Sequence, residues 1–314
     1  MNKKGFEMSF SWLFAILVGA IILFLAITLI TKISDNQNYS NDLIGAKEIS
    51  VLSDNFELGY ETSSISRIKL PSDSRMFLEC SEEGKFGKQE LILNSELYDK
   101  WSDTNQGVTS ENKYFFFEQP IESREFIVFS RIFEFPFKVA TLNYLIPSTE
   151  IYCFIDFPRE LKKDLERNNI SNFELVDEIE ECSLKSKKVC INDDDSNCEV
   201  IVLDYDDRPR VRKQGEVMDY YGNALMFAAI FSDKEIYDCQ LNRLMKRTNS
   251  LIELYLGKAQ IDSFNFCSTN QRTSLEQLNQ STFYFSTDSD LTNPELLYTL
   301  QTLEASARGG GCKL

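Results

Sequence analysis

The clearest pattern in the chain is a long run of apolar residues near its N-terminus. From Met8 to Thr31 there are 24 residues without a formal charge. As a helix this run would be about 36 Å long, which crosses the roughly 30 Å hydrocarbon layer of a bilayer with some tilt. The pattern predicts a transmembrane helix over residues 8–33, preceded by a short leader at residues 1–7.

The segment that follows is polar, and its remaining apolar residues have helical spacing. We interpret residues 34–64 as a stalk that rises from the membrane. One face of a stalk helix is expected to carry the apolar side chains of this segment, namely Leu43, Ile44, Val51, Leu52 and Phe56.

Residues 65–157 contain short runs rich in aromatic and β-branched residues, separated by Asp, Ser, Asn or Pro. Runs such as "QELILN", "KYFFFE" and "EFIVFSRIFEF" are typical of strands, because these side chains fit a pleated, partly buried surface. We therefore predict a β-rich subdomain of mostly antiparallel strands.

Helical patterns enter after Pro158, so residues 158–308 are predicted to form a mixed α/β subdomain. The apolar run over residues 224–231 is too short for a second membrane crossing and is interpreted as a central strand. A long helix is predicted over residues 233–259, where apolar residues recur every three or four positions. Further helices are expected over residues 158–169, 172–185 and 293–303, a buried strand over 199–207, and a flexible tail over 309–314.

In chain order, these patterns predict an α+β fold. A transmembrane helix is followed by a mostly antiparallel β region and then by a mixed α/β region with a long amphipathic helix. We expect the apolar stripe of that helix to lie on a sheet; pairing with another helix is the alternative.

Composition narrows the functions of such a protein. The chain has no histidine, which excludes Ser-His-Asp and Cys-His nucleophile systems, HExxH metalloproteases and an imidazole pH switch. Its 33 basic and 49 acidic residues leave a net charge of −16. That balance argues against nucleic acid as a partner, since such a surface needs clustered Lys and Arg. We expect a protein that is not an enzyme.

Charge also predicts the orientation of the chain in the membrane. Lys3 and Lys4 precede the apolar run, whereas only Lys32 follows it closely. By the positive-inside rule the N-terminus lies in the cytoplasm and residues 34–314 lie outside it. The expected location is the cell membrane, with a single span and an extracytoplasmic C-terminal domain.

The cysteines agree with an extracytoplasmic domain. Eight of them follow the predicted stalk, which is typical of a disulfide framework, and without histidine or a CxxC pair no zinc cluster is expected. Local bridges are expected among Cys182, Cys190 and Cys198; ordinary buried thiols are the alternative. Cys312, on the tail, either pairs or leaves a free thiol elsewhere. The candidates for disulfides are Cys80, Cys153, Cys182, Cys190, Cys198, Cys239 and Cys267.

The first candidate metal site is an acidic segment between two of these cysteines. Asp193, Asp194 and Asp195 follow one another, and oxygen-rich loops suit Ca²⁺. The EF-hand pattern is absent, and a solvated acidic loop is the alternative interpretation.

The second candidate is the end of the strand "VIVLDYDD". Asp204 and Asp206 would project to the same side of an extended chain and hold one Mg²⁺. The segment resembles the nucleophile strand of haloacid-dehalogenase-type phosphatases, although the Thr-Gly segment that follows in that family is missing. This resemblance implies a membrane-tethered, metal-dependent hydrolase, the alternative to a protein without a cofactor. A strand that runs into a polar turn, neutralised by Arg208 and Arg210, explains the same residues.

The N-terminal segment "MNKKGFEMSF" resembles a prepilin leader, in which a short basic segment ending in Gly precedes an apolar helix. Gly5 and Phe6 match the processing junction, which implies cleavage there and packing of the helix in a filament. Pilins commonly carry Glu at the fifth mature position; here that position is Phe10, and the acid is Glu7.

A second resemblance lies in the body of the chain. The segments "IFEFPFKVATLNYLIPSTEIYCF" and "GNALMFAAIFSDKEIYDCQLNRLMKR" are similar to uncharacterised archaeal single-pass surface proteins. We expect a structural or interaction protein of the cell surface, and the prepilin-like start favours a pilin-like one. Its partners are the lipid bilayer and either other surface proteins or further copies of the chain, through the membrane helix.

Overall fold

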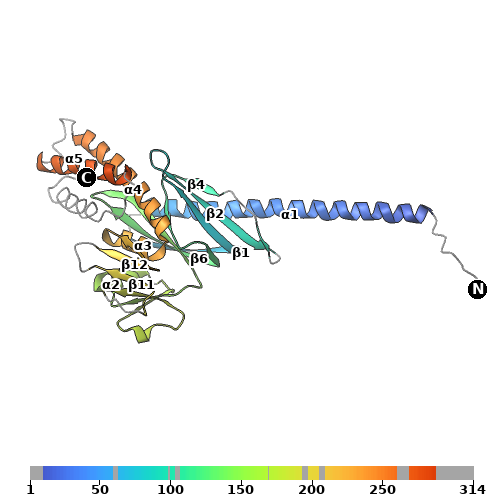
Figure 1. The fold of residues 1–314 in the computed structure, drawn as a ribbon, viewed down its shortest axis with the longest axis horizontal. Helices are drawn as coiled ribbons and strands as arrows, with labels where there is room; N and C mark the ends of the chain where they lie inside the picture. The colour runs from blue at the N-terminus through green and yellow to red at the C-terminus, as the bar shows by residue number, and fades with distance from the viewer. Residues whose placement is uncertain are drawn as a thin grey trace, which may run out of the picture.

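The computed structural model describes residues 10–58, 63–97, 100–102, 107–168, 170–192, 197–204, 209–259 and 269–287. One long helix, α1 (Phe10–Leu58), projects from a domain of two β-sheets and their covering helices (Figure 1). The segment Trp12–Ile30 of α1 is exposed and is long and apolar enough to cross a membrane. The predicted α+β class, with an apolar N-terminal helix, is confirmed.

The first sheet is mostly antiparallel, as predicted. Its described strands lie in the order β3-β2-β1-β6-β7-β5, and β4 pairs with β2. All of these pairings are antiparallel except that of β5 with β7. The strands are β1 (Ser63–Ser81), β2 (Lys88–Leu97), β3 (Lys100–Trp101), β4 (Val108–Ser110), β5 (Tyr114–Phe116), β6 (Ile121–Glu134) and β7 (Lys138–Pro147).

The second sheet is mixed, with the order β13-β12-β11-β10-β8-β9 in the described part of the chain. Strands β9, β8, β10 and β11 are parallel, whereas β12 and β13 are antiparallel additions at one edge. Strand β8 belongs to this sheet although it precedes residue 158. The strands are β8 (Tyr152–Ile155), β9 (Phe173–Val176), β10 (Lys187–Ile191), β11 (Val200–Leu203), β12 (Arg210–Lys213) and β13 (Glu216–Asp219).

The middle of the first sheet, at β6 and β7, is buried on both faces. Alternate side chains of β6 point to opposite sides, so Phe126 and Val128 join a core beneath α1. Ile127 and Phe129 join a larger core that includes residues of the second sheet and of a buried helix, α3. A strand that is covered on both faces loses the apolar–polar alternation of a half-exposed one, and residues 126–129 of β6 are therefore apolar without a break.

Helices complete the domain. Helix α3 lies in the core between the sheets, and α4 packs on the first sheet and on α5. The predicted helices over 158–169 and 233–259 are confirmed, whereas the one over 293–303 lies outside the described residues. The described helices are α2 (Arg159–Asn168), α3 (Gly222–Phe231), α4 (Lys234–Ala259), α5 (Thr269–Thr287) and a short 3₁₀ turn, η1 (Ile179–Glu181).

Two predicted elements were wrong. The run over 224–231 is not a strand but most of α3, and all eight of its residues are buried. An element that is buried on every side shows no periodicity, so the run does not distinguish helix from strand. The predicted helix over 172–185 is instead β9 followed by η1, because Phe173 and its neighbours pair with β8 in the second sheet.

The expected apolar face of the stalk was also wrong. Residues 34–58 continue α1 without a break, but Ile44 and Val51 are 53% and 48% exposed. The face that packs on the first sheet carries Asp42, Ala46 and Ile49, all nearly inaccessible. Gly45 and Ala46, which are also buried on this face, are small and let the helix axis approach the sheet closely. The side chains of Leu52 and Phe56 lie outside the described part of the helix.

Candidate functional site

The C-terminal half of α1 is held on the domain by polar contacts as well as apolar ones. The Ser102 hydroxyl donates a hydrogen bond to Asp42 Oδ2 at 2.5 Å. The buried ammonium of Lys113 donates to the backbone carbonyl of Ser50. Between these contacts, a Cβ added at Gly45 would lie 2.7 Å from Leu93 Cδ2, so only glycine allows this approach without a shift of the sheet side chain. The helix is therefore fixed to the domain on one specific face.

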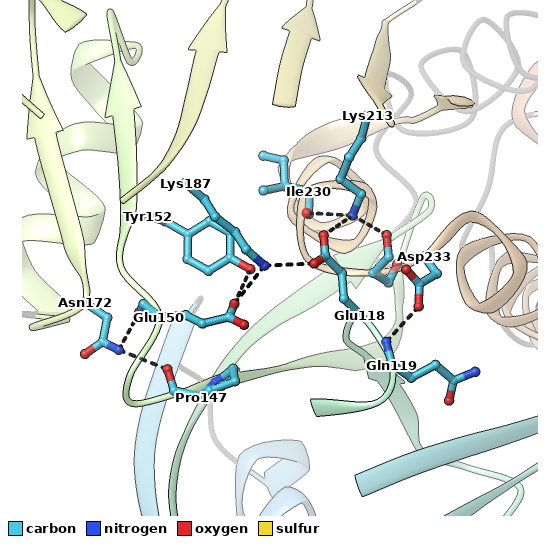
Figure 2. A network of polar contacts seen from close by, with 11 residues as sticks. Glu118, Gln119, Pro147, Glu150, Tyr152, Asn172, Lys187, Lys213, Ile230 and Asp233 are labelled. Carbon is cyan, nitrogen blue, oxygen red and sulfur yellow. Dashed lines mark hydrogen bonds and ion pairs between the residues drawn. The ribbon is translucent and has the colours of Figure 1, made fainter. Parts of the chain in front are cut away.

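A second polar cluster lies where the two sheets meet (Figure 2). Glu118, which lies just after β5, forms ion pairs with Lys187 of β10 at 2.8 Å and with Lys213 of β12 at 2.9 Å. Lys187 also contacts Glu150 at 2.9 Å. We call Glu118, Glu150, Lys187 and Lys213 the Glu118 network. Sequence analysis missed it, because its members are far apart along the chain and belong to no motif.

Lys213 is the most deeply buried member of the Glu118 network, with a side chain only 5% exposed. Besides Glu118, its ammonium donates to the carbonyls of Ile230 at 3.1 Å and Ser232 at 2.5 Å. All three of its protons thus have acceptors, which a buried ammonium requires. The backbone beside Glu118 is held as well, since Gln119 N–H donates to Asp233 Oδ2 at 2.7 Å (Figure 2).

Opposing effects act on the pKa values of this network. Burial alone would raise the pKa of Glu118, but Lys213 and Lys187 together hold it below its ordinary value. Burial lowers the pKa of Lys213, and Glu118 offsets only part of this effect. Burial alone would also lower the pKa of Lys187, but Glu118 and Glu150 raise it above its ordinary value. The Glu118 network therefore links the two sheets by ion pairs. The pKa values of Glu118, Lys187 and Lys213 each depend on the charges of the other members.

The structure brings the starting points of the two predicted metal segments together. Asn192 directly follows β10 and Asp204 directly follows β11, and Asp204 N–H donates to Asn192 Oδ1 at 2.7 Å. Because β10 and β11 are neighbouring parallel strands, their carboxyl ends lie at the same end of the sheet. Among the described residues, no group of three or more Asp, Glu or Cys is placed to hold a metal ion. Asp206, Asp193, Asp194 and Asp195 lie outside the described residues, so the predicted metal sites stay predictions.

A cavity of about 210 Å³ opens at this end of the second sheet. Asp204 lies on its wall together with Tyr220, which precedes α3. The Tyr220 side chain is buried, and its hydroxyl lies within hydrogen-bonding reach of the Asp204 carboxylate. Burial raises the pKa of Tyr220, and the nearby Asp204 carboxylate raises it further. Sequence analysis found Asp204 but missed Tyr220, whose signal was "DYYGN" directly before an apolar run.

Six of the eight cysteines form disulfides in the described residues, which confirms that part of the framework. Cys190 pairs with Cys198, one of the predicted local bridges. Cys182 pairs instead with Cys153 of β8, and Cys80 of β1 pairs with Cys239 of α4. Cys267 and Cys312 lie outside the described residues. The three bridges fit a domain that folds outside the reducing cytoplasm.

Comparison with known protein families, with curated proteins and with solved structures finds no match to this chain. Its class therefore follows from its own features. It joins an apolar N-terminal helix of membrane-spanning length to an α+β domain whose described residues form three disulfides.

Proposed function

We propose that this protein is a structural component of the cell surface that is anchored, and assembles in a pilin-like way, through the apolar half of α1. The observation that carries the proposal is the double role of this one helix. Trp12–Ile30 is exposed and apolar, whereas the same helix packs on the first sheet from Asp42 to Ser50. A helix that is continuous from the apolar segment to the core transmits displacement of the anchor to the domain.

The three disulfides and the basic residues at positions 3 and 4 support the proposed orientation, with the domain outside the cytoplasm. In this arrangement the net negative charge keeps the domain soluble. The only large apolar surface of the described residues is the projecting part of α1. Lipid or the same helix of other copies would cover it.

Processing at the prepilin-like junction is the first test. The intact mass of protein purified from its native membrane without reduction should lack residues 1–5, because Gly5 and Phe6 match the cleavage junction. The same spectrum should show three or more disulfides through missing hydrogens. Gly5→Val should retain the leader, whereas Gly19→Val, a matched change within α1, should not affect cleavage. A native protein with an intact N-terminus would refute the pilin-like part of the proposal, and fully reduced cysteines would refute the orientation.

Docking of α1 is tested by Gly45→Leu in the full chain in detergent micelles. A leucine here collides with Leu93, and overpacking of this kind costs about 1–3 kcal/mol of unfolding free energy. The control is Gly19→Leu, since nothing lies within 4 Å of a Cβ at Gly19. Both changes gain the same helix propensity, roughly 0.8–1 kcal/mol relative to glycine, so their difference isolates the contact with the sheet.

Urea denaturation of the domain measures this difference, and cross-linking between copies provides the assembly readout. We expect Gly45→Leu to destabilise the domain relative to Gly19→Leu, and Gly19→Leu to alter cross-linking between copies relative to Gly45→Leu. Equal stability of the two variants would show that α1 is not docked on the sheet as described. Unchanged cross-linking in Gly19→Leu would argue against assembly through this part of α1.

A further inference from the structure

The Cys80–Cys239 disulfide lies on the wall of a cavity of about 620 Å³, between the end of β1 and the start of α4. Both of its cysteines line the cavity, and both are partly exposed. In each of the other two described bridges one half is closed to solvent, since Cys153 is 0% and Cys190 is 1% exposed. A thiol exchanges with a disulfide only where it can reach a sulfur atom. Of the described bridges, Cys80–Cys239 is therefore the one that a small molecule can approach from both halves.

The lining of this cavity is acidic. No basic side chain lines it, and its carboxylates are Glu79, Glu82, Glu235 and Asp238. Nearby lysines offset part of this charge, because Lys234 pairs with Asp238 at 2.7 Å. Burial raises the pKa of Glu82, and Asp238 raises it further although Lys246 opposes the effect. Glu79 and Glu235 are exposed, and within the described part of the chain neither forms an ion pair. The bridge thus lies in a field of negative charge.

This field makes the charge of an attacking thiol decisive. The nucleophile in thiol–disulfide exchange is the thiolate, which is negatively charged, so the carboxylates repel it from the bridge. An ammonium group on the same small molecule cancels this repulsion and can pair with a carboxylate of the lining. A second negative group on the molecule has the opposite effect. Aminothiols should therefore reach the bridge more readily than neutral or acidic thiols of similar size.

Helix α4 has other contacts that hold it on the first sheet when the bridge is open. The Gln240 amide, directly after Cys239, donates to Gln89 Oε1 at 2.6 Å. One turn further on, the fully buried Arg243 donates to the carbonyl of Glu111 at 3.0 Å. Neither contact involves a sulfur atom, so both remain after the bridge opens. The two cysteines therefore stay close to each other, and the bridge can form again.

We propose that the Cys80–Cys239 bridge is a reversible modification site for small thiols that carry an ammonium group, such as cysteamine. The thiolate attacks one sulfur atom and forms a mixed disulfide, while the S–S bond breaks and the other cysteine leaves as a thiolate that is protonated by water. The ammonium of the adduct lies in the acidic cavity, whose volume of about 620 Å³ is in the usual range for small-molecule sites. Attack of the freed cysteine on the mixed disulfide releases the aminothiol and restores the bridge. The modification requires only the bridge and its cavity, and it does not depend on the proposed anchoring and assembly function.

The first test locates the modification in the full-length protein in detergent micelles. Free thiols are blocked with N-ethylmaleimide, the excess is removed, and the protein is incubated with cysteamine before a second quench with N-ethylmaleimide. Peptide mass mapping should find cysteamine on Cys80 or Cys239 and N-ethylmaleimide on the other, before either label appears at another described bridge. Earlier labelling of Cys153–Cys182 or Cys190–Cys198 would overturn the proposal.

The second test measures the role of charge with three thiols: cysteamine, neutral 2-mercaptoethanol and acidic 2-mercaptoethanesulfonate. The variant is Glu79→Gln with Glu235→Gln, and the quantity compared is its rate of bridge opening divided by the wild-type rate for the same thiol. This ratio cancels the intrinsic reactivity of each thiol. At low ionic strength we expect a ratio of about five for 2-mercaptoethanol, a larger one for 2-mercaptoethanesulfonate and one close to unity for cysteamine. Added salt should reduce the two larger ratios.

The matched control is Glu160→Gln with Glu253→Gln, which changes the net charge equally. Both residues are exposed, and neither lines the cavity, so all three rates should stay nearly unchanged. Thermal unfolding under non-reducing conditions verifies that both double variants fold. Equal ratios for the three thiols, or the same ratios in the control variant, would overturn the proposal.

Discussion

Replacing both Cys80 and Cys239 by alanine is expected to lower the free energy of unfolding by about 4 kcal/mol. The bridge joins β1 to α4 across 159 residues of sequence. A cross-link restricts the unfolded chain more strongly the longer the loop that it closes, and the gain reaches roughly 4–5 kcal/mol for loops of about 100 residues or more. Cys80 and Cys239 are partly exposed and line a cavity of about 620 Å³, so their truncation leaves little buried void.

The matched control is the double alanine variant of Cys190 and Cys198, whose bridge closes a loop with a separation of only 8. The same entropy argument gives about 2–3 kcal/mol for a loop of this length. Urea denaturation under non-reducing conditions measures both losses. If the short loop proved more costly to open than the long one, chain entropy would not be the main contribution of the Cys80–Cys239 bridge.

Glu118→Gln is expected to lower the free energy of unfolding by about 3–5 kcal/mol at neutral pH. The substitution keeps the shape of the side chain but removes the ion-pair partner of the Lys213 ammonium, which is almost completely buried. Asp177→Asn removes one partner of the exposed Lys162–Asp177 pair, and we expect a loss below about 1 kcal/mol there. Equal losses in the two variants would contradict the view that the Glu118 network joins the sheets.

The effect of Glu118→Gln should also depend on pH. The pKa of Glu118 is lower in the folded protein than its ordinary value, so its ionised form stabilises the fold above the ordinary glutamate range. As the pH falls through the lowered pKa, the wild-type protein loses this contribution, and the variant has none to lose. The stability difference should therefore shrink in acid. Denaturation curves between neutral and acidic pH measure it, and a difference that stays constant would show that the charge of Glu118 is not its cause.

A second substitution separates charge from packing. Replacing Glu118 by leucine together with Lys213 by methionine removes both charges and keeps apolar volume between the sheets. Buried ion pairs are often replaced by apolar residues at little cost, so we expect this double variant to be more stable than Glu118→Gln alone. If it is less stable, the hydrogen bonds of Lys213 to Ile230 and Ser232 matter more than its charge.

Candidate site residues were predictable from the sequence only where one short segment carries the chemistry. Asp204 was singled out because it follows an apolar run and forms an Asp-x-Asp pattern with Asp206. No such pattern singles out Tyr220, because a tyrosine beside another tyrosine is equally consistent with core packing. Its relation to Asp204 arises from the pairing of β11 with β12 and of β12 with β13, which brings the residue after β13 to the end of β11. Which residues lie next to each other across a sheet depends on the strand register, and the sequence of neither segment alone determines that register.

The sequence by itself determined the elements whose pattern is local. The uncharged run at residues 8–31, the periodic stripe of α4 and the strand-rich region after residue 65 each follow from the side chains of one segment. The proximity of Cys190 and Cys198 follows equally from their short separation. These features depend on chain length, periodicity and composition, which the linear order contains.

Only the tertiary structure decided the features that depend on what surrounds a segment. The run 224–231 is a helix because it lies between two sheets, and Phe173 lies in a strand because β8 offers it a partner. The face of α1 that docks is the one that carries Gly45 and Ala46, and the Cys80–Cys239 disulfide and the Glu118 network join residues that are distant in sequence. Burial and long-range pairing arise from the whole fold, so a segment that is considered alone does not contain them.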